Sequence, residues 1–225
     1  MEILEQDQRG QQKGEGMSER RSRWLEWARE IQALAETGLH YANNSFERSR
    51  AERLREIAAE IVATHSLMSQ EEVQVAFSAQ PGYITPKVDV RGAVFREQEI
   101  LLVREVMDAG WTLPGGWADV GESPHTAVER EVLEEAGLSV KATRLVGVYD
   151  ANRIETALPL YHAYKLVFLC EPLSDELSTS SETSEVGFFP FDDLPHPLSA
   201  HRTLPRHIVD AVASYRDPNR ATGFD

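Results

Sequence analysis

The stretch from Leu113 to Leu138, LPGGWADVGESPHTAVEREVLEEAGL, restricts the fold of this chain more than any other part of it. Its paired glycines let the backbone turn tightly and approach a ligand closely. A helix is predicted at about Pro124–Ala136, because Ser123 can cap its start and Gly137 can end it in a left-handed conformation. The residues before the glycines read as the end of a strand. The stretch therefore predicts a strand, a tight loop and a helix in immediate succession.

Three glutamates of that helix share one face. Glu131, Glu134 and Glu135 stand at positions i, i+3 and i+4, which places their Cβ atoms about 5–6 Å apart. Like charges at this spacing destabilise an isolated helix, so a counter-charge is expected. Carboxylates are hard oxygen ligands suited to Mg²⁺ or Mn²⁺, and Arg130 can hold a carboxylate through its rigid fork. A surface helix with a solvated acidic face is the alternative interpretation of the same residues.

The spacing of these residues resembles the Nudix box, the signature of the Nudix hydrolase superfamily. The match holds at every specified position, namely Gly116, Glu122, Arg130, Glu131, Glu134, Glu135, Gly137 and Leu138, with apolar residues at 132 and 133. The resemblance implies an α/β fold, the Nudix α/β/α sandwich with a mixed sheet. It also implies an enzyme that hydrolyses a nucleoside diphosphate linked to another moiety, X, into a nucleoside monophosphate and a phosphorylated X.

The same resemblance implies roles for individual residues. Divalent-metal ligands would be Gly116, through its carbonyl, with Glu131, Glu134 and Glu135. Arg130 and Glu122 would support the loop and helix, and Arg130, Glu134 and Glu135 would belong to the catalytic set. The implied cofactor is Mg²⁺, with Mn²⁺ as a possible substitute, because such cations neutralise phosphate oxygens and acidify a water for in-line attack.

Superfamily members often draw a further base or metal ligand from a loop outside the box. The catalytic candidates in this chain are Glu182 and Glu185, in the segment SSETSEVGFFPFDDLP. The alternative is that this segment is only a solvated loop leading into a strand at Val186–Phe189. Trp111 and Trp117 flank the glycine loop, and each can either pack in the core or border a pocket for the base or X.

The rest of the chain divides into three parts. Residues 1–17 are rich in Gln, Glu and Gly and are predicted to be a disordered tail. Residues 18–80 predict amphipathic helices, two of them starting at the capping signatures of Asn44 and Ser69. This helical segment is expected to mediate dimerisation, the alternative being that it only caps the sheet. Residues 84–217 are expected to form the Nudix hydrolase domain.

Within that domain the pattern changes from helical periodicity to short apolar runs. Strands are predicted at Val88–Phe95, Ile100–Arg104, Leu145–Tyr149 and Tyr161–Cys170. A last helix is predicted near Pro205–Ser214, with Ile208, Val209 and Val212 facing inward. Strands with helices between them favour a mixed sheet covered by helices.

Charge and composition exclude several other functions. The chain of 225 residues has 37 Asp and Glu against 23 Lys and Arg, a formal net charge of -14. Such a surface repels phosphate backbones, so nucleic acid is not an expected partner. No apolar run approaches the roughly 20 residues that span a bilayer, so no membrane partner is expected. The single cysteine, Cys170, excludes a disulfide framework and fits a reducing cytoplasm.

Beyond the box, the chain resembles one bacterial Nudix subgroup. The resemblance runs from WLEWAREIQALAETGLHYA through VDVRGAVF to EVGFF. This subgroup carries an N-terminal helical "hydrolase of X-linked nucleoside diphosphate" region and includes CDP-choline pyrophosphatase-like enzymes and ADP-ribose pyrophosphatases. Its members are typically dimers, which implies a homodimer through the N-terminal helices.

The substrate stays open within that resemblance. Ile154 stands where some ADP-ribose hydrolases have a proline, and Glu155 stands where some dinucleoside-polyphosphate hydrolases have a tyrosine. CDP-choline and ADP-ribose are therefore comparable candidates, and the sanitising of oxidised nucleotides is a third. A Nudix-like module that binds nucleotides without hydrolysing them is the rival from another class, although such modules usually lose carboxylates of the box.

Overall fold

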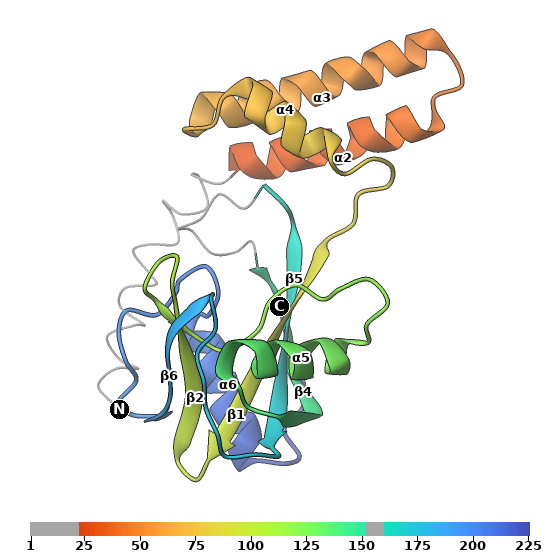
Figure 1. Cartoon of the computed structure of the whole chain (residues 1–225). Coiled ribbons are helices and arrows are strands. Elements are labelled where there is room, and N and C mark those ends of the chain that lie inside the picture. The colour runs from red at the N-terminus through yellow and green to blue at the C-terminus, as the bar shows by residue number, and fades with distance from the viewer. Residues whose placement is uncertain (1–22, 152–159) are drawn as a thin grey trace. The chain divides into compact units, whose positions relative to one another are not determined.

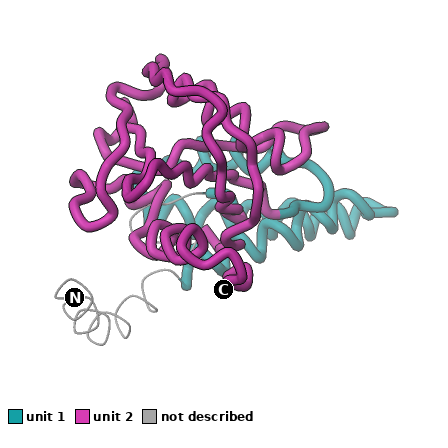
Figure 2. The backbone as a smooth tube through the Cα atoms, turned by 90° about the horizontal axis from the view of Figure 1, so that it is seen from below, with its two compact units in different colours: residues 1–85, 158–162 teal, residues 86–157, 163–225 magenta. Residues whose placement is uncertain are grey.

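The computed structural model of the chain describes residues 23–151 and 160–225, which form two compact units (Figure 2). One unit comprises residues 1–85 and 158–162, and the other comprises residues 86–157 and 163–225. The expected disordered tail, residues 1–17, lies outside the described residues. None of the helices in the described ranges has both the length and the apolar character needed to cross a bilayer.

The first unit is helical and contains α2 (Arg23–Tyr41), α3 (Ser45–His65) and α4 (Gln70–Ser78) (Figure 1). Its core is apolar and draws on all three helices, with small alanines on α2 and α3 that let these helices approach closely. The buried side chains are Leu25, Ala28, Ala58, Ala59, Val62, Val73 and Phe77. Leu160, from the connection between two strands of the other unit, packs against this core. The helical unit is therefore completed by a second, distant segment of the chain.

The two capping signatures start the helices where the sequence predicts. The Asn44 side chain accepts a hydrogen bond of 2.9 Å from the Glu47 amide at the start of α3. Ser69 and Glu72 form a reciprocal capping box at the start of α4. Such caps satisfy amides that the first turn of a helix leaves unpaired.

The second unit holds a mixed sheet in the order β3-β2-β1-β5-β4-β7, with β6 paired to β2. Its strands are β1 (Lys87–Arg96), β2 (Glu99–Glu105), β3 (Trp111–Thr112), β4 (Val140–Asp150), β5 (Ala163–Pro172), β6 (Thr183–Pro190) and β7 (Gly223–Phe224). The pairs β1–β5 and β4–β7 are parallel and the remaining pairs are antiparallel. The four predicted strands correspond to β1, β2, β4 and β5, and the strand named at Val186–Phe189 lies within β6. The strand end expected before the glycine loop is the two-residue strand β3, whereas β7 was not predicted.

Two helices cover opposite faces of the β1–β5–β4 part of this sheet. Figure 1 shows α5 (Pro124–Ala136) in front of these strands and α6 (Pro205–Arg216) behind them. Alternate β1 side chains separate accordingly, because Val90 and Val94 pack in the core under α5 while Ala93 and Phe95 pack in the core under α6. The expected α/β/α sandwich with a mixed sheet is thereby confirmed.

Helix α6 differs from its prediction at one position. Ile208 is buried and Val212 is partly buried, but the Val209 side chain is 54% exposed. The buried set of α6 instead includes His207 and Ala211, which shifts the inward face by one position. The prediction for Val209 was therefore wrong, because neighbouring apolar residues on a helix point about 100° apart and cannot all face one core.

Gly92 of β1 sets how closely α5 can approach the sheet. A Cβ atom at Gly92 would lie 2.5 Å from Val132 Cγ2 and 3.3 Å from Val128 Cγ2. The valine side chains are short and branched, so they cannot swing away from such an atom.

We expect Gly92→Ala to lower the free energy of unfolding by about 1–3 kcal/mol, because it overpacks this interface. Val132→Ala in the same chain removes the colliding methyl, so the double variant loses less stability than the sum of the two single variants. Urea titration of the four proteins measures this coupling, and strictly additive losses would contradict the close approach.

Candidate functional site

The glycine loop is held against β1 by backbone hydrogen bonds. The amides of Gly92 and Val90 donate to the carbonyls of Pro114 and Gly116, each at 2.8 Å, so the loop runs beside the strand. Gly115 has φ of +146°, and a Cβ atom there would lie 2.0 Å from the Val90 carbonyl oxygen. Only glycine fits this position, since an added side chain has neither the space nor the backbone conformation.

Helix α5 follows the loop and begins and ends as the sequence predicts. Ser123 is its N-cap residue, with Pro124 in the first turn, although the Ser123 hydroxyl bonds to Thr126 rather than to a backbone amide. Gly137 ends the helix in the left-handed conformation. The apolar side chains of α5 are buried against the sheet, which fixes the rotation of the helix and turns its acidic face toward the glycine loop.

Glu131 and Glu135 contact the glycine loop directly. A Cβ atom at Gly116 would lie 2.8 Å from Glu131 Oε2, so this carboxylate packs against the Gly116 backbone. The Gly115 amide donates a hydrogen bond of 2.8 Å to Glu135 Oε2. Burial raises the pKa of both carboxyls, and nearby arginine charges oppose that rise. The loop and the helix therefore form one unit of backbone amides and carboxylates.

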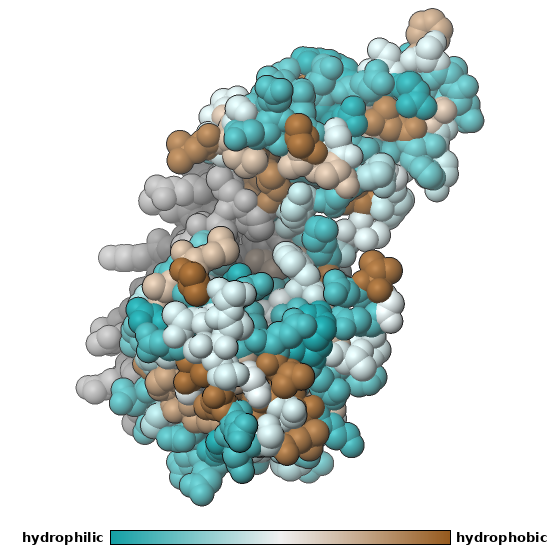
Figure 3. Space-filling view, viewed as in Figure 1, coloured by the Kyte–Doolittle hydropathy of each residue, from teal (hydrophilic) through white to brown (hydrophobic). Residues whose placement is uncertain are grey.

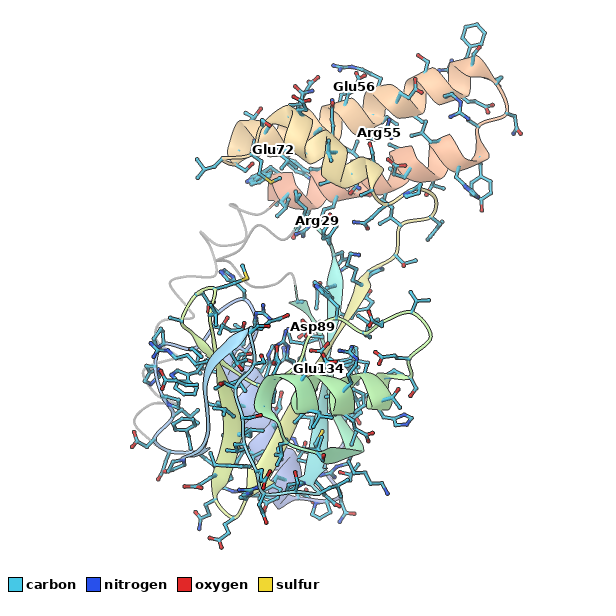
Figure 4. The ribbon with its side chains drawn as sticks, viewed as in Figure 1. Arg29, Arg55, Glu56, Glu72, Asp89 and Glu134 are labelled. Carbon is cyan, nitrogen blue, oxygen red and sulfur yellow. The ribbon has the colours of Figure 1, made fainter. Side chains whose placement is uncertain are left out.

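Arg130 is the counter-charge that the acidic face requires. It forms a bidentate pair with Glu122 at 2.9 and 3.0 Å, and its Nη1 donates to Glu131 and Glu134, each at 2.9 Å. Its Nη2 also donates to the Trp117 carbonyl at 3.3 Å. These bonds raise the pKa of Arg130 and lower that of Glu122. Figure 4 shows Glu134 on α5, with Asp89 on the nearby strand β1.

The two loop glutamates lie in different surroundings. Glu185 on β6 forms an ion pair with Arg104 of β2, and both side chains are partly exposed. Glu182 is exposed and directly precedes Thr183, whose hydroxyl donates a hydrogen bond of 2.8 Å to the Glu135 carbonyl. Burial raises the pKa of Glu105, the charges of Arg202 and Arg91 oppose that rise, and the charges of Asp108 and Glu182 add to it. The residue after Glu182 is thus bonded to the last turn of α5, whereas Glu185 is paired with Arg104 on the β2–β6 pair.

The chemistry of the donors fits a hard divalent cation. Glu131, Glu134 and Glu135 offer carboxylate oxygens, and the Gly116 carbonyl, which already accepts from Val90, keeps a second lone pair. Across residues 23–151 and 160–225, however, no three acidic, His or Cys side chains stand together at metal-binding distances. A cation at this site therefore competes with the Arg130 guanidinium for Glu131 and Glu134.

Several buried charges of this unit were not singled out from the sequence. Asp89, Arg91 and Lys165 are almost fully buried on β1 and β5, and Glu105 is buried at the end of β2. Arg202 Nε lies 3.1 Å from Glu105 Oε1. The signal available in the sequence is a charged residue inside an otherwise apolar strand, as in VDVRGAVF and AYKLVFLC.

The other residues considered in the sequence lie in the core, beside the loop, or outside the described residues. Trp111 is buried and packs against Phe189, so it belongs to the core. The Trp117 side chain is 52% exposed beside the loop and stays a candidate for contact with substrate. Ile154 and Glu155 lie outside the described residues.

Comparison with known families matches both units. Residues 22–77 match a family model described as a UDP-X-like, N-terminal oligomerisation domain. Residues 85–211, more than half of the chain, match the NUDIX domain.

Similar proteins extend over most of the chain. A candidate ADP-ribose pyrophosphatase of Bacillus subtilis (strain 168), YjhB, is 39% identical over 91% of this chain and 98% of its own. The crystal structure of a UDP-X diphosphatase is similar over 91% of this chain and 99% of that chain, with 31% identity and a TM-score of 0.58. An ADP-ribose pyrophosphatase structure from Streptococcus suis 89-1591 covers 63% of this chain and 100% of that chain, with 41% identity and a TM-score of 0.57.

The similarity to these proteins thus covers both units, and it includes the glycine loop and the helix that carries the carboxylates. With residues 22–77 similar to a UDP-X-like N-terminal oligomerisation domain, this protein belongs to the Nudix hydrolase superfamily.

Proposed function

We propose that this Nudix hydrolase cleaves the pyrophosphate of a nucleoside diphosphate linked to X, in a reaction that depends on Mg²⁺. The products are a nucleoside monophosphate and a phosphorylated X. The observation that carries this proposal is the contact of the Glu131 and Glu135 carboxylates with the backbone of the glycine loop. The names of the relatives, ADP-ribose pyrophosphatase and UDP-X diphosphatase, support the substrate class.

The residues of the site divide the work between them. When bound, Mg²⁺ supplies charge neutralisation for the pyrophosphate oxygens and acidifies a water. Glu131, Glu134 and Glu135 would hold the cation, and Gly116 would add its carbonyl. Arg130 keeps the carboxylates in place through its bonds to Glu131 and Glu134.

Glu182 is the better candidate for a general base from the loop. It is exposed, its neighbour Thr183 is bonded to the last turn of α5, and no salt bridge to a described residue ties it down. Glu185 forms an ion pair with Arg104, which fixes it on the surface of the β2–β6 pair. We therefore assign Glu185 a smaller contribution than Glu182.

ADP-ribose and a CDP-alcohol such as CDP-choline are the two substrates that we propose first. An adequate panel contains both, together with a UDP-sugar and an oxidised deoxynucleotide. Cleavage between the phosphates exposes a phosphomonoester, which alkaline phosphatase converts into measurable inorganic phosphate.

We expect at least one X-linked nucleoside diphosphate to be cleaved, EDTA to abolish cleavage, and added Mg²⁺ to restore it. The physical reason is that the pyrophosphate charge repels a nucleophile until a cation neutralises it. Nucleotide binding without cleavage of any compound would instead identify a non-catalytic sensing module. Preferential cleavage of the oxidised deoxynucleotide would identify a sanitising enzyme.

Substitution of the glutamates tests the site itself. We expect Glu134→Gln or Glu135→Gln to lower kcat by about 100-fold or more at saturating Mg²⁺, with far-ultraviolet circular dichroism unchanged. Glu129→Gln is the matched control, because it lies on the same helix and its remaining carbonyl oxygen can still accept the bond from the Ala142 amide. A near-normal kcat in the first two variants would contradict the metal assignment.

The proposed oligomer is a homodimer through the helical unit. Trp27, Leu34 and Tyr41 recur every seven residues along α2 and are 52%, 62% and 64% exposed. Residues at this spacing lie on one side of a helix, and a contiguous apolar surface of this kind marks an interface. Apolar residues, brown in Figure 3, are visible among polar ones on the helical unit. The described function of the matching N-terminal domain as an oligomerisation domain supports this proposal.

Light scattering after size exclusion should give a mass twice the 25.3 kDa of one chain. We expect Leu34→Glu to halve that mass, because it places a charge within the apolar interface. Leu67→Glu, at a fully exposed position of the same unit, is the control and should leave the mass unchanged. A mass near that of one chain for the unaltered protein would rule out the dimer.

A further inference from the structure

A trio of charged side chains is buried beside the glycine loop. The Arg91 guanidinium forms a bidentate pair with Asp89, at 2.9 Å for both bonds. Lys165 Nζ donates to the same carboxylate at 2.7 Å, since Asp89 and Lys165 are direct neighbours in the β1–β5 register. Arg91 and Lys165 are each only 1% exposed. Buried charges are costly unless they are paired, so the arrangement of the three is strictly defined.

The free arm of Arg91 reaches the residue that begins the glycine loop. Arg91 Nη1 donates to the Leu113 carbonyl at 3.2 Å, and the Thr112 hydroxyl donates to the same oxygen at 3.1 Å. On the other side of that residue, the Leu113 amide donates to Thr203 Oγ1 at 3.0 Å. Both polar groups of Leu113 are therefore fixed by buried side chains, two residues before the Gly115 amide that bonds Glu135.

The trio also has a net positive charge close to the carboxylates at the end of α5. One carboxylate and two cations leave a surplus positive charge. Burial lowers the pKa of Arg91, but the carboxylate of Asp89, together with those of Glu135 and Glu105, raises it by more. His207, packed behind the trio on α6, adds no charge, because burial and the two cations lower its pKa to about 3. The surplus charge is thus balanced by Glu135 and Glu105.

We propose that Arg91 is a positioning residue of the site: held by Asp89 and Lys165, it fixes Leu113 so that the Gly115 amide and the Gly116 carbonyl stay aligned with Glu135 and Glu131. This inference rests on the proposed function, because it concerns the same metal-binding residues. Arg91 has no contact with the reacting groups and acts only through the loop.

A purely structural arginine elsewhere in the same unit provides the matched control. Arg144 on β4 donates to the backbone carbonyls of Ser214, Asp217 and Pro218. Its β5 partner, Leu169, lies four residues beyond Lys165, away from the glycine loop. Arg91→Lys and Arg144→Lys therefore both weaken hydrogen bonds from an arginine to backbone carbonyls, but only Arg91→Lys affects the site.

The decisive measurement is Mn²⁺ binding by the substrate-free protein, followed through the electron paramagnetic resonance signal of unbound Mn²⁺. We expect Arg91→Lys to weaken binding about tenfold and to lower kcat about tenfold, as for residues that orient metal ligands. The KM for the nucleotide at saturating Mg²⁺ should stay within about twofold, since no substrate contact is removed. Arg144→Lys should leave Mn²⁺ affinity and kcat unchanged, even if it lowers the melting temperature by as much as Arg91→Lys does.

Thr203→Val provides a second route should Arg91→Lys fail to fold. It removes the acceptor for the Leu113 amide without changing any charge, and it too should weaken Mn²⁺ binding. If Arg91→Lys folds and binds Mn²⁺ as tightly as the unaltered protein, while Glu135→Gln loses activity as expected, the role of Arg91 is overturned and the proposed function stays intact. Absence of both Mn²⁺ binding and hydrolysis in the unaltered protein would remove both.

Discussion

The close approach of Gly115 to the Val90 carbonyl is the constraint on which the site depends. It allows the loop to run alongside β1 and to receive the amide hydrogen bonds of that strand. The loop then meets a helix whose distance from the sheet is set by Gly92. Two glycines without side chains thus determine where the carboxylates of α5 lie, because each removes atoms that would separate neighbouring elements.

Two arginines act on different carboxylates of α5, and they do so from different sides. Arg130 lies on the surface of α5 and bonds Glu122, Glu131 and Glu134 directly. Arg91 is buried in the sheet and acts on Glu135 through its charge and through the glycine loop. The partly exposed arginine can yield its carboxylates to a cation at small cost, whereas the buried one cannot move without breaking its two bonds to the buried Asp89 carboxylate. Arg130 is therefore suited to release its carboxylates when a cation binds, and Arg91 is suited to keep a fixed position.

Much of this could be predicted from the sequence because it is local. The helix caps, the glutamate spacing on α5 and the reach of Arg130 to Glu134 all follow from contacts within a few residues. Strands β1, β2, β4, β5 and β6 follow from their apolar runs, and β3 follows from its place directly before the glycine loop. Strand β7 escaped prediction, because two residues are too few to show a period.

The buried charges escaped prediction for another reason. Alternation along β1 places Asp89 and Arg91 on one face, and charge on alternate positions normally indicates a solvated face. That face is instead covered, since Thr203 and His207 arrive from more than a hundred residues away. Contacts such as the bond from Thr183 to the Glu135 carbonyl are equally distant in sequence and leave no local pattern.

The packing of Leu160 in the helical core makes the N-terminal helices more than an appendage. The chain leaves the sheet-containing unit between β4 and β5, contributes to the helical unit, and returns. Removal of the residues before 85 would take away the helical core against which Leu160 packs and would expose this side chain to water. A chain that lacked these helices would therefore also need a different residue at position 160 to keep this connection from exposing an apolar side chain.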